Sequence, residues 1–108
     1  MSTTMTKVAD AIESLAHRKR SVACKGKTGL RLLMEGLGFK DTAGVAPNHR
    51  IFTHTALSDV TDFISTSVDC THHQNKPMKM PYVLKILGVL RKYKDEFEEL
   101  ERKENENL

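Results

Sequence analysis

The chain of 108 residues is 39% hydrophobic and 29% charged, with a formal net charge of +3 at pH 7. This length supports one domain with a single modest core, and the composition excludes fibrous, low-complexity and disulfide-framework proteins. The longest apolar run, residues 86–90, is far shorter than the roughly 20 residues of a membrane-spanning helix. Residues 1–6 are polar and have no hydrophobic signal core behind them, so we expect neither a membrane span nor a secretion signal.

Charge is unevenly distributed along the chain. Residues 1–93 carry fourteen Lys and Arg against seven Asp and Glu, a net charge of +7, whereas residues 94–108 carry three against seven, a net charge of −4. A body with this positive charge attracts a polyanion, and the acidic end weakens that field on one side. The same charges also suit a purely solubilising role, so charge alone leaves both interpretations open.

The two cysteines indicate the redox compartment. Cys24 and Cys70 lie far apart, with neither the spacing of a metal site nor that of a disulfide framework. We therefore predict reduced thiols in a cytoplasmic protein.

Two helices are predicted in the first forty residues. Apolar residues at helical spacing in residues 5–17 predict a short amphipathic helix, which ends at four consecutive basic residues and is followed by a basic connector at 21–27. A second stripe predicts a helix whose N-cap is Thr28. Gly38 suits the left-handed position after its end, with Phe39 folded back on Met34. The residues of this second stripe are Leu30, Leu33, Met34 and Leu37.

Strand signals follow. Residues 41–48 contain Gly44 and Pro47 and predict a turn, and residues 49–53 predict a short strand. Residues 63–70 alternate, which predicts a half-buried strand. One predicted face of this strand carries Ile64, Thr66, Val68 and Cys70.

The last third of the chain predicts a loop and a helix. Residues 71–80 are polar and contain a proline, and Pro81 suits the first turn of a helix that frays from Glu98 onward. The predicted class is α+β, an antiparallel sheet of two or three strands with helices on one face. We divide the chain into an N-terminal helix and connector (1–27), a main domain (28–97) and an acidic tail (98–108). The buried stripe of the last helix is Val83, Ile86, Leu87 and Leu90.

Residues 29–93 resemble the HicA family of bacterial toxin–antitoxin systems. The shared features are a helix ending in Leu37-Gly38-Phe39, a histidine at the start of a strand, a histidine-containing loop and a C-terminal amphipathic helix. The chain departs from the family where Pro47-Asn48 replaces the Gly-Ser before that histidine, and where the N-terminal helix is added. The quoted segments are Asn48-His49-Arg50-Ile51-Phe52-Thr53-His54, Cys70-Thr71-His72-His73 and residues 82–93.

The resemblance implies a fold and an activity. Family members have a double-stranded-RNA-binding-like fold, and many are ribonucleases that act on messenger RNA. They are neutralised by a HicB antitoxin. By resemblance we expect a metal-independent endoribonuclease toxin without a cofactor, with messenger RNA and a HicB-like protein as partners.

His49 is the best candidate for the catalytic residue. Metal-free RNA cleavage needs a general base for the 2′-hydroxyl and a cation for the charge on the phosphorane, and histidine titrates near neutral pH. The start of a strand aims a side chain rigidly, and Arg50 points to the opposite face. Arg50, Lys76 and Lys79 are the predicted phosphate contacts.

The other histidines leave alternatives open. His72 or His73 supplies a second acid or base, or both belong to a solvated loop. His54 is read as structural or facing the antitoxin, with a catalytic role as the less favoured alternative. A zinc site is disfavoured by the spacing of its donors, so no metal site is predicted. The donors weighed for zinc are Cys70, His72, His73 and His49.

Two other functions compete with the toxin. One is a non-catalytic RNA-binding module of the same fold, which the Pro47-Asn48 departure favours. The other is a protein–protein adaptor that uses its acidic C-terminal helix. The oligomeric state is open, because the added N-terminal helix offers a surface for a second copy.

Overall fold

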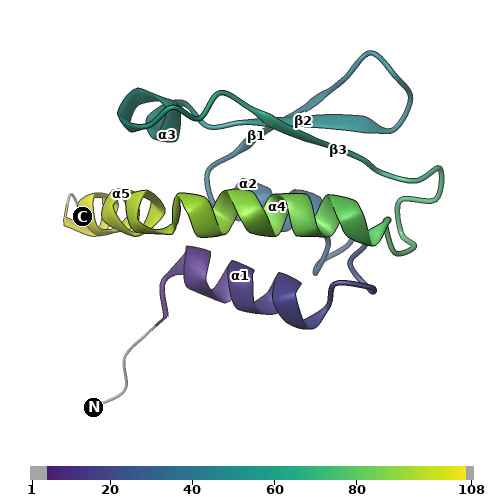
Figure 1. Ribbon diagram of the computed structural model, residues 1–108, viewed down its shortest axis with the longest axis horizontal. Helices are drawn as coiled ribbons and strands as arrows, with labels where there is room; N and C mark the ends of the chain where they lie inside the picture. Colours follow the sequence, from purple (N-terminus) through teal and green to yellow (C-terminus); the bar gives the residue numbers. More distant parts are fainter. Residues whose placement is uncertain (1–4, 107–108) are drawn as a thin grey trace.

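The computed structural model describes residues 5–106 and confirms the α+β class. A three-stranded antiparallel sheet, in the order β1-β2-β3, lies on one side of the molecule, and the long helices lie on the other (Figure 1). The strands are β1 (Lys40–Ala43), β2 (His49–Thr53) and β3 (Thr66–Asp69). The helices are α1 (Lys7–His17), α2 (Leu30–Gly36), α3 (Thr55–Val60), α4 (Met80–Lys92) and α5 (Lys94–Glu106).

One face of the sheet packs against the helices and the other is uncovered. Phe52 of β2 is fully buried, and its neighbours in register, Asp41 and Thr66, share its face. Side chains alternate along a strand, so His49 and Ile51 point to the opposite face. No helix crosses that outer face in Figure 1.

The core joins the inner face of the sheet to the helices. The predicted stripe of α4 is confirmed, since all four of its side chains are at most 1% exposed. Burial of each contributes roughly 1.5–3 kcal/mol. Edge-to-face ring contacts join Phe39 to Phe52 and to Phe63, with centroids 6.4 and 5.9 Å apart.

Helix α2 ends as predicted but begins differently. Gly38 adopts φ +95°, and the N–H groups of Gly38 and Phe39 donate to the carbonyls of Glu35 and Met34, which is a Schellman stop. The prediction of Thr28 as N-cap is wrong, because the N-cap is Gly29.

The reason for this different start is a close approach of the backbone. The N–H groups of Leu30 and Arg31 donate to the carbonyls of Ala23 and Cys24 instead of a capping side chain. A Cβ on Gly29 would lie 2.4 Å from the carbonyl oxygen of Lys25. The preceding connector therefore caps this helix with its own backbone.

Two strand predictions need correction. Residues 40–43 form β1, so the predicted turn at 41–48 is shorter, and Asn48 in it adopts φ +65°. Strand β3 covers only residues 66–69, since Ile64 is 81% exposed while Phe63 is buried. The aromatic contact of Phe63 with Phe39 outweighs the alternation expected before residue 66.

The acidic end is helical rather than frayed. Helix α5 continues to Glu106, with Phe97 buried and Leu100 packed against the core. Its carboxylates also bond the start of α1. Glu98 accepts from the Thr6 hydroxyl at 2.7 Å, and Glu101 accepts from the backbone N–H of Lys7 at 3.2 Å. Helix α1 packs against both α4 and α5, so the ends of the chain share one core.

The two cysteines are joined, which corrects the prediction of reduced thiols. Cys24 and Cys70 form a disulfide with their Cα atoms 5.8 Å apart. The connector runs antiparallel to the loop after β3, with a bridge between Ala23 and Pro77. The two cysteines are 46 residues apart in sequence, so no local spacing could reveal that they are in contact.

Within residues 5–106, no helix has the length and apolarity needed to cross a bilayer.

Candidate active site on the open sheet face

His49 opens β2 on the uncovered face of the sheet. Its Nδ1 lies 2.7 Å from Oδ1 of Asp69, the residue opposite it in the register of β2 and β3. The His49 side chain is 31% exposed, and no hydrogen bond joins its Nε2 to any residue in the described range 5–106. The ring is therefore anchored at one nitrogen and accessible at the other.

Asp69 is held from two sides. Its second oxygen, Oδ2, accepts from the hydroxyl of Tyr82 on α4 at 3.0 Å. Hydrogen bonds from His49 and Tyr82 lower the pKa of Asp69, and the Asp69 carboxylate raises the pKa of Tyr82. Because an ionised carboxylate only accepts, Nδ1 of His49 must carry a proton, and in the neutral ring this leaves the lone pair on Nε2.

Gly44 completes the seat of the histidine ring. A Cβ built on Gly44 would lie 2.4 Å from Cδ2 of His49. The backbone N–H of Gly44 donates to the His49 carbonyl at 2.8 Å. The ring thus fits between the backbone of the β1–β2 turn and Asp69. A histidine seated in this way is pre-oriented for proton transfer.

The predicted phosphate ligands are found in different places. Arg50 lies on the inner face, as strand alternation predicted, and its Nε bonds Asp41 at 2.8 Å. The same carboxylate binds Arg31 at 2.7 Å, so Arg50 is paired and turned away from His49. Lys79 is exposed at the start of α4, and its charge helps to lower the pKa of Asp69.

Lys76, His72 and His73 belong to a polar hollow beside the site. It has a volume of about 440 Å³, and we call it the loop hollow. The two imidazole rings meet edge to face with centroids 5.2 Å apart. Asn48, which also lines it, directly precedes His49. The lining residues are Lys25, Asn48, His72, His73, Gln74, Asn75 and Lys76.

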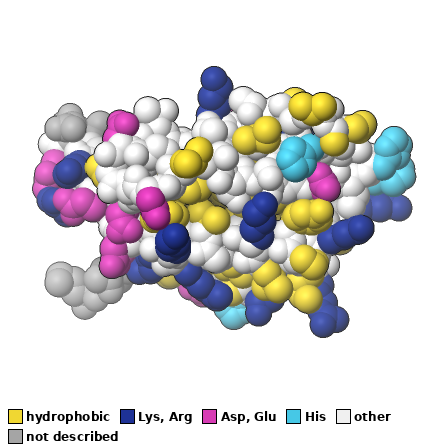
Figure 2. Space-filling view, turned by 45° about the horizontal axis from the view of Figure 1, so that its top comes forward, with side chains coloured by type: hydrophobic (Ala, Val, Ile, Leu, Met, Phe, Trp, Pro, Cys, Tyr) yellow, Lys and Arg dark blue, Asp and Glu magenta, His cyan; other side chains and the backbone are white. Residues whose placement is uncertain are grey.

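The surface is polarised around this region. Figure 2 shows most acidic side chains at one end of the molecule, and histidines toward the opposite end and at the lower edge of the view. One histidine lies beside a single acidic side chain on the face shown. The acidic side chains thus gather at one end, whereas Lys and Arg side chains are spread over the face shown.

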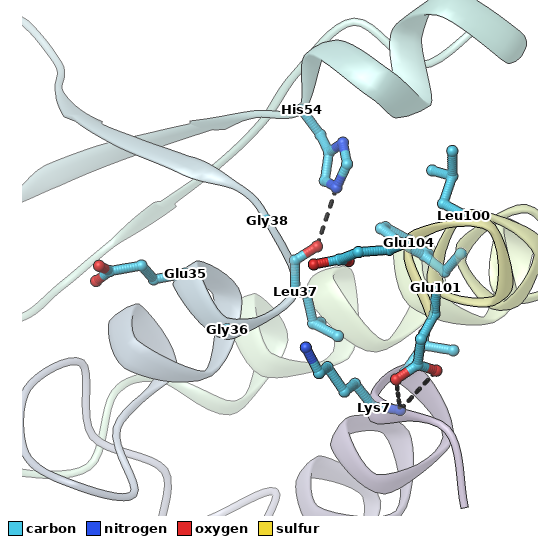
Figure 3. A pocket seen from close by; sticks show the side chains of 11 residues that line it. Lys7, Glu35, Gly36, Leu37, Gly38, His54, Leu100, Glu101 and Glu104 are labelled. Atoms are coloured by element: carbon cyan, nitrogen blue, oxygen red, sulfur yellow. Dashed lines mark hydrogen bonds between the residues drawn. The ribbon is translucent and has the colours of Figure 1, made fainter. Parts of the chain in front are cut away.

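His54 has the structural role, one of the alternatives predicted for it. It is only 8% exposed, and its Nδ1 accepts from the N–H of Leu57, so Nε2 must be the nitrogen that donates to the carbonyl of Leu37. Figure 3 shows it lining a cavity of about 290 Å³ with side chains of α1 and α5. His54 therefore ties the end of α2 to the start of α3.

Sequence reasoning missed Gly44, Asp69 and Tyr82. Alternation placed Asp69 on the polar face of its strand, but only the pairing register sets it opposite His49. Among residues 5–106 no three His, Cys, Asp or Glu side chains are grouped as a metal site, and the sulfur of Cys70 is bonded to Cys24.

No family model, curated protein or solved structure matches this chain.

Proposed function

We propose that the protein is a metal-independent endoribonuclease that cleaves messenger RNA, the toxin of a HicA-type toxin–antitoxin pair. The observation that carries this proposal is the 2.7 Å contact between His49 Nδ1 and Asp69 Oδ1 on the uncovered sheet face. It gives the proposed mechanism an oriented general base. The resemblance of residues 29–93 to the family is the second support.

In the proposed reaction His49 removes the proton of a ribose 2′-hydroxyl through Nε2. The resulting oxygen attacks the adjacent phosphorus, the bond from phosphorus to the 5′-oxygen breaks, and a 2′,3′-cyclic phosphate and a 5′-hydroxyl form. Asp69 stabilises the imidazolium that His49 becomes. The 5′-oxygen takes its proton from a second donor, for which His72 and His73 are the candidates.

Cations near the site would stabilise the phosphorane charge. Lys79 is the best placed, because its charge already acts on Asp69. Lys76 in the loop hollow contributes to general phosphate attraction. Arg50 is omitted from the proposed site, because its guanidinium is paired with Asp41 on the other face.

The proposed partner is a HicB-like protein that covers His49, and the proposed compartment is the cytoplasm, where messenger RNA is found. The uncovered sheet face is the surface on which such a partner would block the base. Disulfides are rare in cytoplasmic proteins, and the Cys24–Cys70 bond is the observation that weighs against this compartment. Thiol trapping in cell extracts measures whether the bond exists in the cell.

The test is cleavage of a purified messenger RNA in EDTA by the parent, His49→Ala and Asp69→Asn proteins. We expect His49→Ala to lose about 10²- to 10⁴-fold in rate, as general-base catalysis typically contributes. His17→Ala is the matched control, because His17 ends α1 and is exposed. Cleavage by His49→Ala at the parental rate would refute the mechanism.

A parent protein that binds RNA without cutting it would favour the non-catalytic RNA-binding module instead. Expression in cells separates the two functions independently. A toxin stops growth and is relieved by the product of the neighbouring gene, whereas a simple RNA-binding module is tolerated.

A further inference from the structure

The loop hollow is built from segments far apart in the chain. The disulfide at Cys24 and the bridge between Ala23 and Pro77 fix the connector against the loop after β3. The backbone N–H of Lys25 then donates to the carbonyl of Gln74 at 2.9 Å. These links place Lys25 on the wall of a hollow otherwise formed by residues 48 and 72–76.

The hydrogen bonds inside the hollow leave an amide donor available to bind a ligand. Gln74 accepts from Arg31 through Oε1 at 3.2 Å and donates from Nε2 to Asn48 Oδ1 at 3.4 Å. The acceptor of the Asn48 amide is therefore occupied. Its Nδ2 donates to no partner within residues 5–106 and is available to an acceptor.

The remaining lining groups are cationic or polar. Lys25 and Lys76 bring two ammonium groups, and His72 and His73 add two imidazoles in contact with each other. Among the residues that the structure describes, no Asp or Glu lines the hollow. A cavity that offers N–H donors and positive charge, without a carboxylate, suits an anion with several oxygens, such as a phosphate group.

We propose that the loop hollow binds a phosphate of the RNA strand next to the one on which His49 acts. The proposal rests on the proposed function, and it adds to it a subsite that includes Lys25. Asn48 links the two places, since it lines the hollow and directly precedes His49 in the chain. Lys25 lies outside the segment 29–93 that carries the HicA resemblance, so this wall is a feature of the present chain.

Binding is measured with a 2′-O-methyl RNA oligonucleotide, which lacks the attacking hydroxyl and so reports affinity without cleavage. Lys25→Gln is compared with Lys27→Gln, since Lys27 is an exposed lysine of the same connector that does not line the hollow. We expect Lys25→Gln to weaken binding about tenfold, and Lys27→Gln about twofold or less. The slope of log affinity against log salt should fall by about 0.7 only in Lys25→Gln.

The outcomes separate this subsite from the catalytic proposal. Equal losses in the two variants would overturn the subsite, because both lysines would then act only through general charge. Titration with inorganic phosphate should shift the side-chain amide NMR signals of Asn48. Such a shift without any dependence of RNA affinity on Lys25 would indicate a free-anion site and also overturn the proposal. A Lys25 effect on binding in a protein that never cuts RNA would leave the subsite standing and refute the catalysis.

Discussion

Replacing Gly44 with alanine tests the seat of His49 without touching either member of the His–Asp pair. The new Cβ would lie 2.4 Å from Cδ2 of the ring, whereas ordinary contact begins at 3.4 Å, so the ring must retreat by about 1 Å. Because the ring fits between Gly44 and Asp69, it has no room to move back toward Asp69 and must swing away from both, which breaks the 2.7 Å bond to Asp69. A misplacement of about 1 Å can cost roughly 10²-fold in rate, and we expect a loss of that order in RNA cleavage.

The matched control is Gly88→Ala in α4, where an added Cβ meets nothing within 4 Å. This change should leave cleavage unaltered and stabilise the helix by about 0.5–1 kcal/mol. NMR of the histidine ring follows the displacement independently of activity, since the Nδ1 proton loses its acceptor in Gly44→Ala. Unchanged His49 signals together with parental cleavage would refute the reasoning about the ring seat.

Three further predictions concern stability and titration. Thr66→Val should raise the free energy of unfolding by about 1 kcal/mol, and Tm by about 4–8 °C, because the buried Thr66 hydroxyl has no hydrogen-bond partner among residues 5–106. Tyr82→Phe should raise the pKa of Asp69 toward its ordinary value, as measured by carboxyl NMR, because one of its hydrogen bonds is removed. The ionised Asp69 stabilises the fold at neutral pH, and on acidification the variant should lose this stabilisation at a higher pH than the parent does. Reducing the bond between Cys24 and Cys70 should lower the free energy of unfolding by about 4 kcal/mol, from the loop entropy of a 46-residue separation, as measured by denaturant titration.

Each of these predictions has a control and a contrary result. Thr53→Val changes a hydroxyl on the outer face of β2 and should be nearly neutral, so equal effects at both threonines would contradict the argument from burial. An unchanged Asp69 titration curve in Tyr82→Phe would show that His49 alone sets that pKa. A variant with both cysteines replaced by alanine should not respond to reductant. A parental protein equally insensitive to reductant would show that the crosslink contributes little.

Periodic patterns predicted helices α1, α2 and α4, because those patterns depend only on neighbours along the chain. The short helix α3 was not predicted, and α5 was expected to fray. The α4 stripe and the Schellman stop at Gly38 follow from residues three to five positions apart, and the structure confirms both. The strand at 49–53 was also predicted. Its position at the centre of the sheet follows from pairings with residues 40–43 and 66–69 on either side.

Long-range contacts account for most of what the sequence did not reveal. Asp41 looked like a turn residue, yet Arg31 and Arg50 neutralise it within a strand. Cys24 and Cys70 gave no spacing signal because their contact depends on the connector folding back on a distant loop. In the candidate site, His49 was found by residue type and by resemblance. Its partner Asp69 could be identified only from the pairing register of β2 and β3, which cannot be read from the sequence.

The bonds from α5 to the start of α1 have a consequence for the timing of synthesis. Helix α1 ends at His17, but Glu98 and Glu101 bond its first turn from near the other end of the chain. At a synthesis rate of about 5–20 residues per second, roughly 4 to 18 s pass between the addition of residue 17 and that of residue 106. During that interval the apolar stripe of α1 lacks its final partner. Helix α1 can therefore complete its native contacts only after residues 98 and 101 have been synthesised.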